Sequence, residues 1–292
     1  MGNVYDAMKK HEAEQAARAA AGQDDAGKDT SASAQGASPE AAPAAEAPRR
    51  PRRPRLRTNG YAPELVAHGD RGGRLAEEYR ALRTNLLARY EDDRFCILVT
   101  SSQGGEGKTV TCLNLGFVLA ELPDRRTIIL DCDLQKGNVN TLLGMPATPG
   151  LGDVLRGEAA PEAAVHKTTC ENLSVLPAGE VDREETGDLL GRPELEELVQ
   201  TLRREYDFVL IDTPPIRVAG APRRYRRSIS YSTAGILGRT ARDALLVVRM
   251  NKTRRESVEA SLRQLKSAKV RPVGLVLTHQ RHVIPEFLYR LF

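Results

Sequence analysis

Short apolar runs alternate with amphipathic segments along most of this chain of 292 residues. Five apolar runs lie between polar or turn-forming residues, which is typical of strands buried on both faces of a sheet. These runs span residues 95–100, 127–130, 208–211, 243–249 and 272–278. Segments 74–90, 194–204 and 253–268 place apolar residues at spacings of three and four and predict amphipathic helices. This alternation predicts an α/β fold with a doubly wound, mostly parallel sheet.

The helix predicted at 74–90 has two distinct faces. Its apolar stripe, which we expect to contact the core, consists of Leu75, Tyr79, Leu82, Leu86 and Tyr90. Glu77, Arg80 and Arg83 recur every three residues on a neighbouring face, so Glu77 can pair with Arg80. From these residues alone, a solvated, self-paired face and a contact with a second subunit both remain open.

Residues 1–60 differ in composition from the rest of the chain. They are rich in Ala, Ser, Gly, Pro and Gln and contain few large apolar residues, which predicts a disordered tail. The tail ends in a proline-rich segment with six arginines, from Arg49 to Arg57. This segment suits an anionic lipid surface or nucleic acid, or is a solvated linker. Residues 61–292 then form one domain.

Cysteine usage and hydropathy point to the cytoplasm. The cysteines are Cys96, Cys112, Cys132 and Cys170. None is spaced as Cys-x-x-Cys, and most lie in or beside apolar runs, so we expect reduced core thiols. No apolar run approaches the length of about 18 residues that a membrane-spanning helix needs, and there is no signal-peptide pattern. The net charge of +4 is mild.

The strand predicted at 95–100 leads directly into a glycine-rich loop that ends in Gly-Lys-Thr, followed by an apolar helix from Lys108. Strand, glycine loop and helix N-terminus together hold polyphosphates, because backbone N–H groups and a lysine point at the anion. The strict pattern G-x-x-x-x-G-K-[ST] fails only at Ser102. We expect ATP to bind the loop residues Gly104, Gly105, Glu106, Gly107, Lys108, Thr109 and Val110.

Acidic residues follow two further predicted strands. Asp131 and Asp133 end the strand at 127–130, and Asp212 ends the strand at 208–211. The carboxyl ends of parallel strands form one edge of a doubly wound sheet, where such folds bind ligands. Each aspartate alone would more often be a turn or helix cap. Together with the loop they predict a site for Mg²⁺ and ATP.

These motifs resemble those of the bacterial tyrosine kinase (BY-kinase) family of capsule and exopolysaccharide systems. The family's loop reads close to S-x-x-P-G-E-G-K-[ST], and residues 101–109 match it except for Gly104 at the proline. Its D-x-D-x-R motif is matched at Asp131 and Asp133 but not at Gln135, and its D-x-x-P motif is matched at 212–215. The resemblance covers about residues 61–285.

The resemblance implies a role for each site residue in an ATP-dependent tyrosine autokinase. Lys108 and the loop amides would hold the ATP phosphates, and Thr109, Asp133 and Asp212 would hold Mg²⁺. Asp131 would accept the proton of the tyrosine hydroxyl; the residues alone do not separate its role from that of Asp133. The catalytic set is thus Lys108, Asp131, Asp133 and Asp212.

The resemblance also implies partners. Glu77, Arg80 and Arg83 match the E-x-x-R-x-x-R element through which the family self-associates, which implies a ring-shaped homo-oligomer. Relatives without membrane spans act with a membrane-bound polysaccharide co-polymerase or activator. We therefore expect recruitment to the inner face of the plasma membrane, with contact through residues 49–57, and no nucleic-acid partner.

Three departures separate the chain from the family pattern. Gln135 replaces an arginine, and 217–233 is an atypical basic insertion. The family usually ends in a tyrosine cluster, whereas this chain has only Tyr289 near its end, our candidate phospho-acceptor. Tyr225 and Tyr231 in the insertion are possible substitutes.

Two other functions remain open. A switch ATPase of the ParA/MinD class shares the fold and the loop. That class carries a second lysine near the start of the loop, where this chain has Gln103, and the Pro-Pro pair after Asp212 also favours the kinase. A nucleotide-binding scaffold without turnover is the third reading, which the three departures permit.

Overall fold

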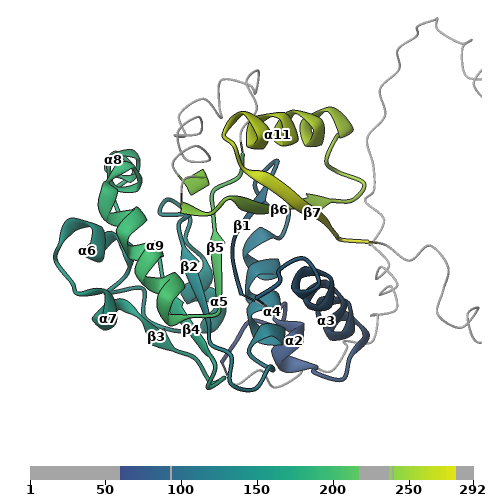
Figure 1. The fold of residues 1–292 in the computed structure, drawn as a ribbon, viewed down its shortest axis with the longest axis horizontal. Helices are drawn as coiled ribbons and strands as arrows, with labels where there is room; N and C mark the ends of the chain where they lie inside the picture. Colours follow the sequence, from purple (N-terminus) through teal and green to yellow (C-terminus); the bar gives the residue numbers. More distant parts are fainter. Residues whose placement is uncertain (1–59, 93, 217–236, 239, 281–292) are drawn as a thin grey trace, which may run out of the picture. The chain divides into compact units, whose positions relative to one another are not determined.

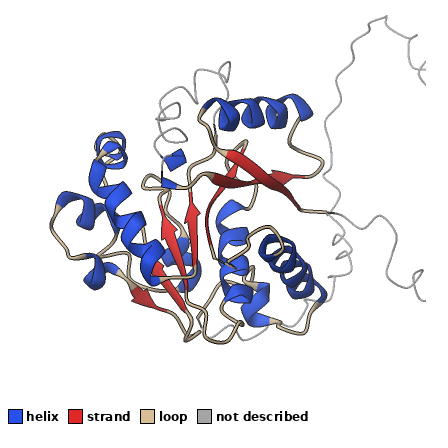
Figure 2. Cartoon of the chain, in the orientation of Figure 1, coloured by secondary structure: helices blue, strands red, loops and turns tan. Residues whose placement is uncertain are grey.

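The computed structural model describes residues 60–92, 94–216, 237–238 and 240–280 (Figures 1 and 2). The strands are β1 Phe95–Ser101, β2 Thr127–Asp131, β3 His166–Lys167, β4 Leu173–Leu176, β5 Phe208–Asp212, β6 Asp243–Arg249 and β7 Arg271–Thr278. The helices are α2 Val66–Gly69, α3 Arg74–Leu87, α4 Lys108–Leu119, α5 Val139–Leu143, α6 Leu151–Arg156, α7 Pro161–Ala164, α8 Thr186–Gly191, α9 Pro193–Glu205 and α11 Arg255–Ser267.

Several expectations fall outside these residues. Residues 1–59 of the expected tail, with the arginine-rich segment 49–57, are not among them. The basic stretch 217–233 and Tyr289 are not among them either. Within the described ranges, no helix has both the length and the apolar character that crossing a bilayer requires.

The seven strands form one sheet in the order β3-β4-β2-β5-β1-β6-β7. All neighbouring pairs are parallel except β3 with β4. The predicted doubly wound, mostly parallel sheet is therefore confirmed. The five predicted strands are all present, with ends that differ by at most one residue from the sequence-based bounds.

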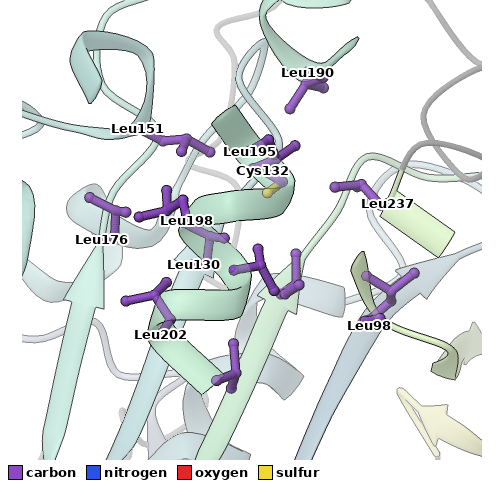
Figure 3. Close-up of a cluster of buried hydrophobic side chains, with 14 of the residues drawn as sticks. Leu98, Leu130, Cys132, Leu151, Leu176, Leu190, Leu195, Leu198, Leu202 and Leu237 are labelled. Atoms are coloured by element: carbon purple, nitrogen blue, oxygen red, sulfur yellow. The ribbon is translucent and has the colours of Figure 1, made fainter. Parts of the chain in front are cut away.

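Alternate side chains of the central strands point into two separate cores, one on each face of the sheet. In β1, Cys96 and Leu98 belong to the core beneath α6, α8 and α9, and Ile97 and Val99 to the core beneath α2, α3 and α4. Figure 3 shows the first core, where leucines of α9 lie beside Leu130 of β2 and Cys132 just after it, while Leu98 of β1 lies nearer Leu237. Burial on both faces explains the uninterrupted apolar runs in these strands.

The cysteines fit this arrangement. Cys96, Cys112 and Cys132 are buried, Cys170 is half-buried, and all four are free thiols. Burial raises the pKa of Cys96 to about 12, so this thiol stays protonated at neutral pH. The expectation of reduced core thiols is confirmed for the three buried cysteines.

The apolar stripe predicted for α3 is partly wrong. Leu75 is 59% exposed, and Ala76 is fully buried in its place. The buried face is thus rotated by one residue, about 100°, at the start of the helix, while Leu86 remains in the core as expected. Tyr90 lies beyond the end of the helix, and its hydroxyl donates to Asp243 at the start of β6 (2.7 Å).

A close backbone contact joins α6 to the residues that follow β4. The apolar pattern did not predict the strand β4. The backbone N–H of Leu151 donates to Pro177 O (2.7 Å), and that of Gly152 donates to Ala178 O (3.0 Å). A Cβ atom built on Gly150 would lie 2.4 Å from the backbone nitrogen of Gly179. Only glycine at position 150 permits this approach, because the obstructing atoms belong to backbone and cannot rotate away.

Substitution of Gly150 tests this contact. Gly150→Ala should lower the free energy of unfolding by about 1–3 kcal/mol, as expected for overpacking against atoms that cannot move aside. Gly191→Ala is the control, because no atom lies within 4 Å of a Cβ built there. We expect the control to change stability by no more than about 1 kcal/mol, in the stabilising direction. Urea unfolding of both variants measures the difference, and equal stability would contradict the contact.

Candidate functional site

The three strands that end in the predicted motifs are direct neighbours in the sheet. β5 lies between β2 and β1, and Asp212 is in register with Asp131 on one side and Val99 on the other. The loop that follows β1 therefore emerges beside both aspartates. The expectation that these strand ends share one edge is confirmed by the strand order.

The glycine loop between β1 and α4 has an open outer side. Gln103, Gly104 and Gly105 are exposed, and a Cβ atom built on either glycine would meet no atom within 4 Å. Gly105 and Gly107 have φ values of 78° and 91°, which favour glycine strongly. α4 begins immediately afterwards at Lys108, so its unpaired N-terminal N–H groups face the same loop.

Lys108 lies between two carboxylates. Its Nζ is 2.8 Å from Asp133 Oδ2 and 3.7 Å from Asp212 Oδ1, and its side chain is only 11% exposed. Burial alone would lower the pKa of Lys108, but the charges of Asp212 and Asp133 outweigh burial and raise it. Lys108 is therefore a permanent cation held at the sheet edge.

Asp131 is fully buried beside this pair. Its Oδ1 accepts the backbone N–H of Asp133 (3.0 Å), and its Oδ2 accepts that of Val139 (3.3 Å). Burial, together with the negative charge of Asp212, raises the pKa of Asp131 to about 8. A carboxyl group with such a pKa exchanges a proton near neutral pH, as a general base must.

Asp212 is fully buried, and its carboxylate faces the ammonium group of Lys108 and the hydroxyl of Thr109. Among the described residues, no donor reaches either carboxylate oxygen with standard hydrogen-bond geometry, and Lys108 Nζ lies 3.7 Å from Oδ1. Burial raises the pKa of Asp212, and the charge of Lys108 opposes that effect. Since buried carboxylates are normally satisfied, this one fits a site completed by a cation or its water.

The far side of the loop is held through Glu106 by two residues that the sequence patterns did not reveal, Thr253 and Thr278. Glu106 is 2% exposed, and its carboxylate accepts the backbone N–H of Gln103 (2.9 Å) and the hydroxyl of Thr253. Thr278 at the end of β7 donates to the Glu106 carbonyl (2.7 Å). Glu106 therefore offers a phosphate only its backbone N–H, because its side chain points into the protein.

Two further contacts tie the loop to the β6–β7 side of the sheet. The hydroxyls of Ser102 and Ser261 are hydrogen-bonded (3.0 Å), and Arg249 donates to Gly105 O (3.4 Å). These partners lie more than 140 residues from the loop along the sequence. Residue spacing and hydrophobic periodicity within short segments therefore could not have indicated these contacts.

The residues Glu77, Arg80 and Arg83 form an ion cluster within the chain. Arg80 binds both oxygens of Glu121 (2.6 and 2.8 Å) and pairs with Glu77 (2.5 Å), as predicted. Arg83 also contacts Glu121 (3.1 Å) and donates to the carbonyl of Val118. Glu121 follows the C-terminus of α4, about 18 Å from the phosphate loop for a helix of this length.

Comparisons with known proteins agree with this geometry. An AAA-domain family model matches residues 95–219. Tyrosine-protein kinase YwqD of Bacillus subtilis is 30% identical over 207 residues, which cover 70% of this chain and 81% of YwqD. Tyrosine-protein kinase Wzc of Salmonella typhimurium is 30% identical over 215 residues, but the match spans only 28% of Wzc.

Solved structures of similar fold also include a tyrosine kinase domain. The kinase domain of the Escherichia coli tyrosine kinase ETK superposes with a TM-score of 0.65 at 25% identity, covering 76% of this chain and 83% of that chain. The septum site-determining protein MinD of Pyrococcus horikoshii, complexed with Mg-ADP, superposes with a TM-score of 0.50 at 30% identity. The match covers 67% of this chain and 76% of the MinD chain. The chain thus has the fold of P-loop nucleotide-binding proteins.

The raised pKa of Asp131 predicts a pH-dependent stability in the absence of nucleotide and Mg²⁺. The folded state binds this proton up to about pH 8, whereas the unfolded chain loses it near its ordinary value. The stabilisation is complete below the unfolded pKa and is lost as the pH rises through 8, so the melting temperature should fall between about pH 5 and pH 8.

Asp131→Asn should reduce this slope, because an amide does not titrate; the part that comes from the raised pKa of Asp212 remains. Asp188→Asn, a change at an exposed position of α8, is the control and should retain the slope of the parent. Differential scanning calorimetry in EDTA across this pH range measures both. A parent melting temperature that is constant from about pH 5 to pH 8 would contradict the assignment.

Proposed function

The chain belongs to the family of bacterial tyrosine-protein kinases. On that premise we propose that it is an ATP-dependent protein tyrosine autokinase, which phosphorylates tyrosine residues in copies of this same chain. The observation that carries this proposal is the convergence of Lys108, Asp131, Asp133 and Asp212 beneath an open glycine loop. Phosphoryl transfer needs mainly positioning and charge neutralisation, and this arrangement supplies both.

In this proposal the loop holds the ATP phosphates. The exposed backbone of Gly104 and Gly105 and the N–H groups of residues 107–110 would donate to phosphate oxygens. Lys108 would exchange its contact with Asp133 for the terminal phosphates, since a polyanion competes for the same ammonium group. Gln135 replaces the family's arginine, so Lys108 carries more of the charge neutralisation.

The residues at the sheet edge also fit Mg²⁺. Asp212 offers two buried carboxylate oxygens that no donor among the described residues reaches with standard hydrogen-bond geometry, and Asp133 and the hydroxyl of Thr109 would complete a set of oxygen ligands. When bound, Mg²⁺ neutralises the charge on the transferring phosphoryl group. Asp133 is released for this role once Lys108 contacts phosphate.

Asp131 is the proposed general base. The tyrosine hydroxyl oxygen attacks the γ-phosphorus, the bond between that phosphorus and the β–γ bridging oxygen breaks, and ADP leaves. The hydroxyl proton passes to the ionised form of Asp131, and a carboxylate whose pKa is raised to about 8 is a stronger base than an ordinary aspartate. Tyr289, which lies outside the described residues, remains our proposed acceptor.

The biological setting is proposed from the resemblance. We infer a role in exopolysaccharide or capsule synthesis or export, exercised with a membrane-bound polysaccharide co-polymerase or activator. Residues 49–57, outside the described part, would contact the anionic inner face of the plasma membrane. A soluble peptide of the activator's cytoplasmic tail is the reagent through which this partnership can be tested.

A ParA/MinD-type switch ATPase is the second candidate, favoured by the likeness to MinD with Mg-ADP. The structural likeness to the ETK kinase domain is greater, with a TM-score of 0.65 against 0.50. The two functions differ in their product, because a switch ATPase releases inorganic phosphate and a kinase keeps it on tyrosine. A scaffold without turnover would bind ATP and produce neither.

The first experiment measures where the phosphate goes. Purified protein incubated with Mg·ATP and an activator tail peptide should accumulate phosphotyrosine, and phosphopeptide mapping should place it at Tyr289. Lys108→Met should reduce incorporation by about 100-fold or more, as loss of a preorganised cationic group does. Lys266→Met, at an exposed position of α11, is the control and should retain the activity of the parent.

Lys108 neutralises two buried carboxylates, so its loss can also destabilise the fold. Asp212→Asn keeps the pair of Lys108 with Asp133 and serves as a second loss-of-function variant. Equal phosphotyrosine in the parent, Lys108→Met and Asp212→Asn would contradict the site assignment. Release of inorganic phosphate without phosphotyrosine would favour the switch ATPase, and bound ATP without either product would favour the scaffold.

We also propose that the face carrying Glu77, Arg80 and Arg83 mediates self-association. Glu77 is 63% exposed and Leu75 beside it is 59% exposed, so this end of α3 presents both charge and apolar surface. Arg80 and Arg83 already contact Glu121 within the chain. Contact with a neighbouring subunit must therefore share or replace those ion pairs.

Two sets of variants separate the internal role of the arginines from an intermolecular one. Changing Glu77, Arg80 and Arg83 to alanine should leave a folded monomer where the parent forms oligomers. Glu121→Ala breaks the internal pairs but leaves the arginines in place, and it should preserve the oligomer. Sedimentation velocity measures the mass. An oligomer that survives the triple change, or is lost equally in Glu121→Ala, would contradict the proposed interface.

A further inference from the structure

A cavity of about 840 Å³ lies at the opposite edge of the sheet from the phosphate loop. Its lining includes Phe95, Asp243 and Arg271, which are the first residues of β1, β6 and β7. These strands are parallel, so their amino ends share one edge. β1 alone separates the cavity from the phosphate loop by about 20 Å, since a strand of seven residues has that length.

One helix supplies the other wall of this cavity. Glu196, Gln200 and Arg203 of α9 lie along the lining. They are four and three residues apart and therefore form one stripe of the helix, distinct from its buried leucines. The walls of the cavity are consequently built from regular secondary structure, which fixes the positions of their backbones.

The cavity has a marked excess of cationic side chains. Its lining contains Arg94, Arg203, Arg242, Lys269 and Arg271, against only Glu196 and Asp243. Both oxygens of Asp243 are already engaged: Arg271 donates to each of them at 2.8 Å, and Tyr90 donates to Oδ2. Arg94 lies 3.4 Å from Asp207. These residues satisfy one another without any ligand.

Three lining cations have no such partner. Within the described ranges, the side chains of Arg203, Arg242 and Lys269 form no ion pair and no hydrogen bond, and only Glu196 offers an unengaged carboxylate. Like charges gathered around one concavity repel one another, and a bound anion would relieve that repulsion. Phosphate groups suit this set, because arginine presents paired N–H donors to two phosphate oxygens at once.

We propose that this cavity at the amino edge of the sheet binds a phosphate-bearing small molecule, up to the size of a nucleoside diphosphate, through Arg203, Arg242 and Lys269. The cavity volume lies within the range typical of small-molecule sites. The site is separate from the phosphate loop and uses none of its residues. It would give the protein a second place at which to sense phosphorylated metabolites.

Inorganic pyrophosphate is the probe, and isothermal titration calorimetry of the full chain is the measurement. Mg·ADP at saturation occupies the phosphate loop, and titrations into Lys108→Met repeat the test independently of the function proposed for that loop. Saturable binding of pyrophosphate should appear in both. Arg203→Ala combined with Arg242→Ala should weaken it by at least about tenfold, because two charge-assisted contacts are lost.

Arg204→Ala is the matched control. Arg204 is the next residue on α9, is also exposed, and does not line the cavity. Its loss should change the affinity by less than about twofold, since exposed charges outside the site are largely screened. No saturable binding of pyrophosphate to the parent in the presence of saturating Mg·ADP would overturn the proposal. So would equal weakening by Arg204→Ala, because it would assign the binding to diffuse surface charge.

Discussion

The structure depends most on a single buried cation among three carboxylates. Lys108 is 11% exposed and lies 2.8 Å from Asp133 and 3.7 Å from Asp212, while Asp131 is fully buried beside them. Without the lysine, three carboxyl groups would share a poorly solvated sheet edge with no cation beside them, which is costly for those that are ionised. Because the carboxyl groups at this edge outnumber the single lysine, the edge favours additional positive charge. This excess destabilises the chain without ligand, and it would favour the binding of a nucleotide together with a metal ion.

The loop above this cluster is held from both sides of the fold. Its N-terminal end continues β1 in the middle of the sheet. Its far side is held through Glu106 by Thr253, which follows β6, and by Thr278, the last residue of β7. Because Glu106 is turned inward, the outward side consists of glycine backbone and helix N–H groups. Rigid support beneath a flexible glycine sequence allows the loop to present donors at fixed positions, which is what electrostatic stabilisation of a phosphoryl group requires.

Much of this arrangement could be predicted from the sequence because it follows from rules about backbone. Uninterrupted apolar runs predicted the central strands, and parallel strands bring their carboxyl ends together, so Asp131 and Asp212 could be placed beside the glycine loop. Long-range side-chain contacts could not be predicted. Nothing in the spacing indicates that Glu106 meets Thr253, that Arg80 meets Glu121, or that Ala76 replaces Leu75 in the core. These depend on how helices rotate and pack, which short patterns leave open.

The central claim is that Lys108 passes from Asp133 to phosphate when nucleotide binds. A crystal structure of the full chain with Mg²⁺ and a non-hydrolysable ATP analogue tests it most directly. The account predicts that Lys108 Nζ leaves its position 2.8 Å from Asp133 and contacts the terminal phosphates, with Asp212 facing the metal or its water. An unbroken pair of Lys108 with Asp133, with nucleotide bound elsewhere or not at all, would contradict it.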